Sequence, residues 1–287
     1  MTRRSNLNDR TFTIGNKDDV TNGKLPNSTF VMTCAYDLQG HRTGRTDTQT
    51  SAVVTYVYDA ENQWIEASTP TTAVGAFKVQ FTYDGKNRLR KRKNFTAVGS
   101  AWNAGNETLY IYDRMKVIQE RNQYNIPTVA YTWEMDLSGT LNGAAGIGGL
   151  LARDSSYYNV DGNWYAHDYP HFDGNGNVTA LASYSKQIDV TYVYDPFGRV
   201  TSQSGPMATA NKYRFSSKIW QDNVDMIYFG YRFYDPNIQR WLNRDPLGNK
   251  GLNYCVADKL TNLVTGRAST YLFATVPRTR SILTDAL

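Results

Sequence analysis

The stretch Val53-Val-Thr-Tyr-Val-Tyr-Asp-Ala-Glu-Asn-Gln-Trp64 contains the pattern that decides the fold of this 287-residue chain. Every second residue ahead of its aspartate is apolar, which is typical of a β-strand: Val54, Tyr56 and Tyr58. Asp59 ends the strand, because a short carboxylate can accept hydrogen bonds from backbone N–H groups one or two residues on. Asn62 tolerates a positive φ, and the apolar period resumes at Trp64. The stretch therefore predicts a β-hairpin.

The same aromatic-Asp pair recurs along the chain, with 22 to 29 residues between neighbours apart from one wider gap. The pairs are Tyr36-Asp37, Tyr58-Asp59, Tyr83-Asp84, Tyr112-Asp113, Phe172-Asp173 and Tyr194-Asp195. Periods of this length indicate repeated supersecondary units. Because one hairpin cannot bury its own aromatic face, consecutive hairpins must stack edge to edge. We therefore predict an all-β fold, in which consecutive antiparallel β-hairpins form one extended curved sheet.

Each predicted turn has the same two landmarks after its aspartate. Three residues on, five of the six repeats carry Gly or Asn, and the sixth carries Lys116. Two residues further, the apolar period resumes at Trp64, Leu89, Ile118, Val178 and Val200. Arg42 departs from this pattern. No convincing helical periodicity occurs between residues 31 and 245.

Composition sets limits on function. The 13% aromatic content, with 21 Tyr, favours pleated sheet surfaces, and a formal charge of +5 does not require a nucleic-acid partner. The basic run from Arg88 to Lys93 is interpreted as a solvated hairpin arm. No apolar run is long enough for a membrane span, and the N-terminus lacks a hydrophobic leader, so the localisation stays open.

Residue patterns for metal or cofactor chemistry are weak. Cys34 and Cys255 are too few for a disulfide scaffold or a metal knuckle. His167 and His171 are four residues apart, but Pro170 between them argues against the helix that would direct both at one metal. The glycine-rich stretch 143–149 lacks a βαβ context and is interpreted as a hairpin tip. We expect no cofactor and no metal.

Three ordered motifs near the C-terminus resemble a known family. They are Tyr194-Asp-Pro-Phe-Gly-Arg-Val-Thr-Ser202, Tyr213-Arg-Phe-Ser-Ser217, and the longer Tyr228-Phe-Gly-Tyr-Arg-Phe-Tyr-Asp-Pro-Asn-Ile-Gln-Arg-Trp-Leu-Asn-Arg-Asp-Pro-Leu-Gly248. The string resembles the RHS repeat-associated core, and the upstream hairpins resemble the YD repeats of RHS proteins. The resemblance covers roughly residues 31 to 264.

The resemblance implies a hollow bacterial shell, secreted or at the cell surface, in which the sheet spirals around a cavity and the core segment plugs one end. In such relatives the shell encloses the protein's own C-terminal segment, often a toxin, and the core acts as an aspartyl self-protease. Arg244 and Asp245 match the family's first Arg-Asp position. The expected second Asp falls on Thr265, so we expect self-cleavage to be impaired, because one carboxylate cannot supply both acid and base.

The predicted organisation has four parts: a polar lead-in or degenerate repeat at 1–30, a YD-repeat sheet at 31–205, the RHS core at 206–265 and a divergent tail at 266–287. The preferred function is a structural segment of a partial shell that encapsulates or presents a C-terminal segment. An impaired self-cleaving module and a carbohydrate or cell-surface binding module are the alternatives. The expected partner is the chain's own C-terminal segment or the rest of a longer RHS protein, with cell-surface glycans as a further candidate.

Overall fold

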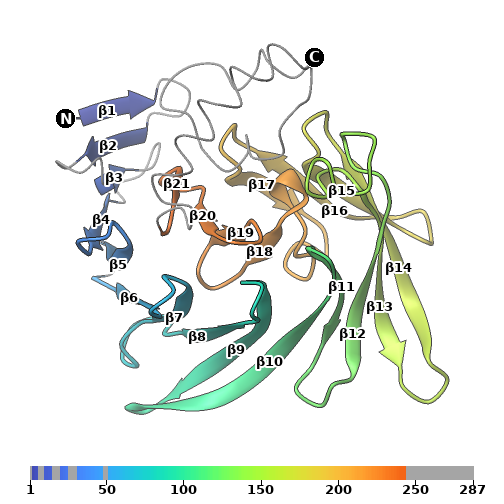
Figure 1. The fold of residues 1–287 in the computed structure, drawn as a ribbon, viewed down its shortest axis with the longest axis horizontal. Helices are drawn as coiled ribbons and strands as arrows, with labels where there is room; N and C mark the ends of the chain where they lie inside the picture. Colours follow the sequence, from blue (N-terminus) through green and yellow to red (C-terminus); the bar gives the residue numbers. More distant parts are fainter. Residues whose placement is uncertain (1, 6–9, 15–19, 25–30, 48–50, 244–287) are drawn as a thin grey trace. The chain divides into compact units, whose positions relative to one another are not determined.

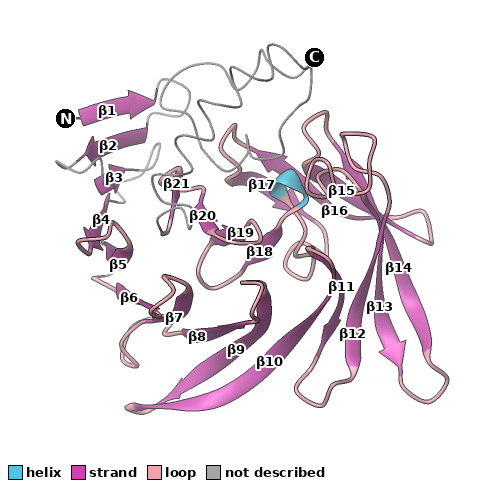
Figure 2. Cartoon of the chain, in the orientation of Figure 1, coloured by secondary structure: helices cyan, strands magenta, loops and turns pink. Residues whose placement is uncertain are grey.

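A computed structural model describes residues 2–5, 10–14, 20–24, 31–47 and 51–243 of the chain. These residues belong to one compact unit, Met1–Arg244. The predicted all-β class is confirmed, since the only helical element among the described residues is one 3₁₀ turn, η1 (Phe215–Ser217) (Figure 2). No helix in these ranges is long and apolar enough to cross a membrane.

Seventeen strands form one large sheet (Figure 1). Its strands are β1 (Thr2–Ser5), β2 (Arg10–Ile14), β3 (Val20–Lys24), β4 (Val31–Tyr36), β5 (Arg42–Asp47), β6 (Val53–Tyr58), β7 (Trp64–Ser68), β8 (Lys78–Tyr83), β9 (Leu89–Val98), β10 (Ala101–Asp113), β11 (Lys116–Arg121), β12 (Pro127–Trp133), β13 (Leu150–Tyr158), β14 (Asn163–Phe172), β15 (Val178–Ser183), β16 (Ile188–Tyr194) and β17 (Val200–Ser204). Antiparallel ladders join each strand to the next in sequence. The predicted succession of stacked hairpins is thus confirmed.

The aspartates close the turns as the sequence predicts. Asp59 Oδ1 accepts hydrogen bonds from the backbone N–H groups of Glu61 and Gln63, both at 2.9 Å, so the donors lie two and four residues on, where one or two had been expected. Asn62 adopts the expected positive φ of 63°. The same bonds recur at Asp37, Asp84, Asp173 and Asp195. In five of the six repeats, the same pair of aspartate hydrogen bonds therefore ends the first strand and closes the turn.

In four of the six repeats, the tyrosine ahead of the aspartate joins its hairpin to the previous one. Tyr83 Oη donates to the carbonyl oxygen of Trp64 at 2.6 Å, and Trp64 is the first core residue after the preceding turn. Three other tyrosines bond in the same way: Tyr58 to Arg42, Tyr112 to Leu89, and Tyr194 to Val178. Trp133, which precedes Glu134, makes the equivalent bond to Val117 through its indole N–H. This hydrogen bond explains why the aromatic-Asp pair, and not merely the aspartate, is the unit that repeats.

The turn between β10 and β11 departs from the prediction. Ile118 had been expected to resume the apolar period, but Val117 is the buried residue and Ile118 is exposed. Asp113 pairs directly with Lys116, which leaves a two-residue loop with Arg114 at a φ of 52°. The loop is therefore one residue shorter than in the other repeats, and the returning strand shows its other face to the core.

A second, four-stranded sheet lies against the large one. Its strands are β18 (Ile219–Gln221), β19 (Met226–Tyr228), β20 (Phe233–Asp235) and β21 (Arg240–Trp241). Phe233 packs edge-on against Trp64 with ring centroids 4.6 Å apart, and against Phe81 at 5.3 Å. One hydrophobic cluster contains residues of both sheets. Residues 206–243, here called the core segment, are therefore part of the same hydrophobic core as the hairpins.

Contacts with the core segment show that the large sheet is curved. Arg42 at the start of β5 bonds to Asp235, and the backbone N–H of Val178 at the start of β15 bonds to the carbonyl oxygen of Arg214. Between these strands, Arg92 of β9 bonds to Gln221. Strands as far apart in the ladder as β5 and β15 can reach one short segment only if the sheet bends around it (Figure 1).

Candidate functional site: the interface between the sheet and the core segment

A buried ion pair attaches the core segment to the first hairpins. Arg42 Nη1 lies 2.8 Å from Asp235 Oδ2, and both side chains are 1% exposed. The Arg42 guanidinium also stacks over the ring of Tyr56 at 4.9 Å. The backbone is fixed as well, since Arg42 N–H donates to the carbonyl oxygen of Leu242 at 3.1 Å. Arg42 therefore takes the apolar position of its repeat because its partner is a carboxylate of the core segment.

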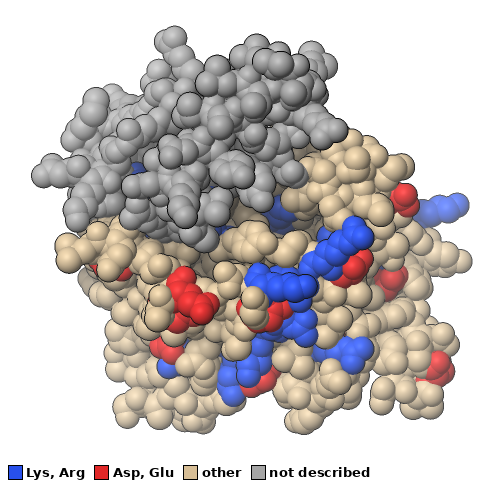
Figure 3. All heavy atoms as spheres, in the orientation of Figure 1, with Lys and Arg blue, Asp and Glu red and all other residues tan. Residues whose placement is uncertain are grey.

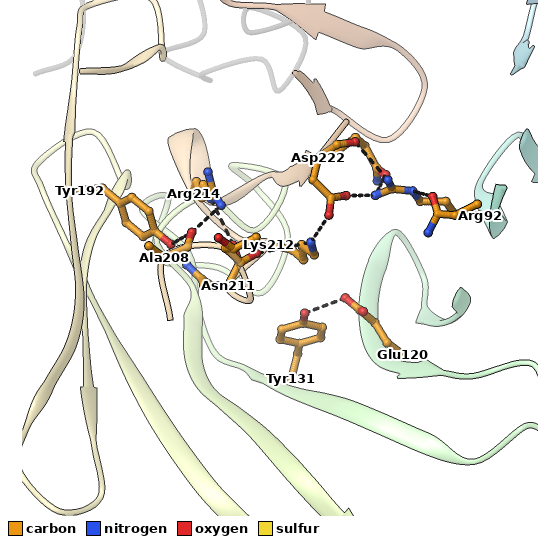
Figure 4. Close-up of polar contacts among 12 residues, drawn as sticks. Arg92, Glu120, Tyr131, Tyr192, Ala208, Asn211, Lys212, Arg214 and Asp222 are labelled. Carbon is orange, nitrogen blue, oxygen red and sulfur yellow. Dashed lines mark hydrogen bonds and ion pairs between the residues drawn. The ribbon is translucent and has the colours of Figure 1, made fainter. Parts of the chain in front are cut away.

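A second charged cluster attaches the middle hairpins (Figure 4). Arg92 forms an ion pair with the Asp222 carboxylate and donates to the Asp222 carbonyl oxygen at 3.0 Å. It also donates to Gln221 Oε1 at 3.1 Å. Lys212 Nζ lies 2.9 Å from the other Asp222 oxygen. Burial tends to raise the pKa of Asp222, but Arg92 and Lys212 hold it below its usual range, so this carboxylate stays ionised.

The basic run that contains Arg92 is thus not simply a solvated arm. Arg92 is buried, whereas Arg88 pairs with Asp84 and Lys93 pairs with Glu107 on the surface. On the face shown in Figure 3, acidic side chains lie among the basic ones, so charges of both signs interleave there. Arg88, Arg92 and Lys93 of the basic run therefore pair with carboxylates of this same chain.

A third set of contacts attaches the last hairpins. Arg214 donates to the carbonyl oxygens of Ala208 at 2.6 Å and Asn211 at 3.1 Å, and its guanidinium stacks over the Tyr192 ring at 5.0 Å. Tyr192 Oη donates to the same Ala208 oxygen at 3.0 Å (Figure 4). The start of the core segment is thereby fixed against β16.

Three loops interlock beside this set. Ser217 Oγ donates to the carbonyl oxygen of Gly176 at 2.8 Å and accepts from the backbone N–H of Gly148 at 2.9 Å. A Cβ on Gly176 would lie 2.5 Å from the Ile147 side chain, so only glycine fits this contact. The glycine-rich stretch 143–149 is the second half of the loop between β12 and β13, and it contacts Ser217 through the backbone N–H of Gly148.

A buried carboxylate faces the interface without a direct ion pair in the described contacts. Glu120 Oε1 accepts from Tyr131 Oη at 2.7 Å, while Lys212, Arg153 and Arg92 act on it only at longer range. Burial raises the pKa of Glu120 above its ordinary value. Figure 4 shows Glu120 and Tyr131 on the sheet opposite Lys212 of the core segment.

The structure does not describe the residues expected to cleave the chain. Arg244, Asp245 and Thr265 are all outside the described residues. The last described residues are well anchored: Leu242 is buried, and Asn243 Nδ2 donates to the carbonyl oxygen of Asn62 at 3.1 Å. No group of three or more His, Cys, Asp or Glu side chains suited to a metal occurs within the part of the chain that the structure describes.

Sequence reasoning missed the charged residues that build the interface. Arg42 and Arg92 come from separate hairpins, and their partners lie far away in sequence; Arg42 and Asp235, for example, are 193 residues apart. One signal was available, because Arg42 stands where the other repeats place an apolar residue. A charge at a core position predicts a buried partner.

The fold and the interface together define a β-hairpin scaffold that holds its own C-terminal core segment. The nuclease of Bacillus spizizenii named tRNA3(Ser)-specific nuclease WapA is 27% identical over 218 residues, which cover 74% of this chain and 8% of that protein. Double-stranded DNA deaminase toxin A of Burkholderia cenocepacia is 22% identical over 203 residues, 68% of this chain and 14% of that protein. No family model matches the chain.

Solved structures share the fold. The TcdB2-TccC3 structure superposes with a TM-score of 0.54 at 15% identity, covering 84% of this chain and 12% of that one. TcdB2-TccC3-Cdc42 gives a TM-score of 0.51 at 14% identity, covering 83% and 14%. Together with the sequence matches, these similarities support a relationship to toxin proteins of the RHS type. The chain spans about a tenth of the length of the curated relatives it matches.

Proposed function

We propose that the chain is a structural segment of an RHS-type shell from a secreted or cell-surface bacterial protein, and that it encapsulates or presents a C-terminal segment. The observation that carries the proposal is the interface: Arg42 and Arg92, from hairpins far apart in the sheet, both bond to residues of the core segment. A buried cation that loses its partner is costly, so each contact resists release of the segment.

The relatives support a structural role for the matched region. One is named a nuclease and the other a deaminase toxin, yet both match this chain over about 200 residues. A stretch shared by proteins with different named activities is better explained by a common scaffold than by either chemistry. The activities in those two names therefore give no reason to assign a catalytic residue to this chain.

The proposal is tested by cutting the connection between the two sheets. Thr209 and Ala210 are both exposed in the loop between β17 and β18, so a specific protease site can be inserted between them. After cleavage, the part from residue 210 onward should remain bound to the hairpins in size-exclusion chromatography and separate only in denaturant. Separation without denaturant would contradict a scaffold that retains its C-terminal segment.

Two matched variants show which contacts retain the core segment after cleavage. Asp222→Asn removes the carboxylate that Arg92 and Lys212 both contact, and should release the cleaved part at a lower urea concentration. Glu107→Gln removes a carboxylate from the surface pairs with Lys91 and Lys93 and should leave the release point unchanged. Equal release points for the two variants would argue against the interface as the source of retention.

A further inference from the structure

Two lysines meet at the loop between β12 and β13. Lys218, which follows η1, donates from Nζ to the carbonyl oxygen of Ala145 at 2.6 Å. Lys116, the first residue of β11, donates from Nζ to the carbonyl oxygen of Glu134 at 3.4 Å. The Lys116 Cε also lies beside Gly146, where an added Cβ would be 3.3 Å away. Ala145 and Gly146 are neighbours, so the two side chains, here called the lysine pair, flank the same short segment.

Neither member of the lysine pair has a carboxylate at ion-pair distance within the described parts of the chain. Ion pairs there involve four other lysines: Lys78, Lys91, Lys93 and Lys212. Glu134 contacts Lys116 through its backbone oxygen, and its side chain is exposed. Asp136 acts on Lys218 only at longer range, and its carboxylate already accepts four hydrogen bonds from Ser138, Ala144 and Gly146 of its own loop. The two ammonium groups are therefore left with carbonyl partners.

This setting makes the Lys218 amine less basic. Burial lowers its pKa to about 8; Asp136 opposes this effect, and the Lys116 ammonium adds to it. At pH 7.5 about a quarter of such amines are uncharged, against about one in a thousand for an ordinary lysine. Desolvation and a neighbouring cation together are a recognised way of making a lysine nucleophilic.

The amine can be reached and its product can be accommodated. Both members of the lysine pair are partly exposed, and Ala145, which Lys218 contacts, is exposed and carries only a methyl group. An uncharged amine that donates one N–H to the Ala145 carbonyl oxygen keeps its lone pair free to attack. The amide formed by acylation still has one N–H, so the same hydrogen bond can persist after the reaction.

We propose that Lys218 is an acylation site whose donor is an acyl phosphate. The Nζ lone pair attacks the acyl carbonyl carbon, the C–N bond forms and the C–O bond to phosphate breaks, so inorganic phosphate leaves with the bonding pair. The attacking nitrogen gives its proton to water or to the phosphate. Lys116 is a positioning residue, because its charge attracts the anionic donor to the reacting amine. Acylation also removes one of the two neighbouring cations.

Treatment of the full chain with acetyl phosphate at pH 7.5 tests the proposal, and peptide mass spectrometry locates the modified lysines. We expect Lys218 to be acetylated about tenfold faster than Lys186, which is exposed in the β15–β16 turn. This factor is smaller than the difference in uncharged amine, because a less basic amine is also a weaker nucleophile.

The variant Lys116→Gln separates positioning of the donor from general reactivity. Glutamine keeps a donor for the Glu134 carbonyl oxygen but removes the charge, so acetylation of Lys218 by acetyl phosphate should slow about tenfold. The uncharged ester p-nitrophenyl acetate should lose less, because with it only the effect of Lys116 on the pKa of Lys218 is removed. The control Lys86→Gln, which removes an exposed lysine from the β8–β9 turn, should leave both rates unchanged.

The proposal is overturned if Lys218 reacts no faster than Lys186, or if Lys116→Gln and Lys86→Gln give equal rates. Equal slowing of acetyl phosphate and of the neutral ester in Lys116→Gln would contradict an acyl phosphate as the donor. If Lys116→Gln does not fold, as judged by far-ultraviolet circular dichroism, the pH dependence of the unsubstituted chain replaces it. The rate of Lys218 with the neutral ester should then level off above about pH 8, and a rise that continues beyond about pH 10, as for an ordinary lysine, would overturn the proposal.

Discussion

Replacing Arg42 by methionine should destabilise the protein more than any surface charge change. Methionine keeps much of the apolar stem of Arg42 but removes the guanidinium, and the Asp235 carboxylate is left buried without its cation. Breaking a buried ion pair in this way costs about 3–5 kcal/mol. Loss of the cation–π contact with Tyr56 adds to the penalty.

Urea unfolding followed by tryptophan fluorescence measures this loss, because Trp64 packs directly on Phe233 of the core segment. The second variant, Asp235→Asn, removes the other charge, and the double variant removes both. We expect the double variant to be less destabilised than the sum of the single variants by about 1–3 kcal/mol, as for other residues in direct contact.

The control for Arg42→Met is Lys93→Met, which breaks the surface pair with Glu107. Its side chain is 28% exposed, and pairs of this kind contribute about 0–1 kcal/mol. The reasoning would be refuted if Arg42→Met and Lys93→Met lowered the free energy of unfolding equally, or if the effects of Arg42→Met and Asp235→Asn were simply additive.

Three further predictions concern other parts of the molecule. Tyr83→Phe deletes the hydroxyl that bonds to the Trp64 carbonyl oxygen and should lower the free energy of unfolding by about 0.5–1.5 kcal/mol in urea, whereas Tyr124→Phe should change nothing. Glu120→Gln should raise the melting temperature by about 2–4 °C at neutral pH, because burial raises the pKa of Glu120 above its unfolded value and the ionised form opposes folding. This gain should begin to shrink as the pH falls through the raised folded-state pKa and be gone below the unfolded-state pKa, where Glu120 is protonated in both states; a gain that persists in acid would contradict the assignment. Intact-mass measurement should give the full-length chain, and a species shortened near residues 265–270 that Asp245→Asn abolishes would show that self-cleavage is not impaired.

The hairpins could be predicted because the chemistry that makes them is local. Asp59, Asn62 and Trp64 lie within six residues of one another, and each acts through its own backbone preference or burial. One further turn of the same kind lacks the aromatic residue ahead of its first residue. Asn122 accepts hydrogen bonds from the backbone N–H groups of Tyr124 and Ile126, two and four residues on, as the recognised aspartates do.

The interface could not be predicted to the same depth, because register and partner choice depend on the folded sheet. The one-residue shortening after Asp113 changes which of Val117 and Ile118 is buried, and nothing in the local alternation separates the two. Nor does the local pattern show that Tyr231 is 55% exposed while Tyr228 and Phe233 are buried; Tyr231 lies in the short connection between β19 and β20.

Hydrogen exchange in the native state is the most direct measurement of whether the hairpins and the core segment form one cooperative structure. The shared core predicts that amides of β18 and β19 exchange only on global unfolding, as slowly as those of β8, and that Arg42→Met accelerates both sets together. Exchange of β18 and β19 that is orders of magnitude faster than that of β8 would mean that the core segment opens independently, and would contradict a sheet folded around a segment that it retains.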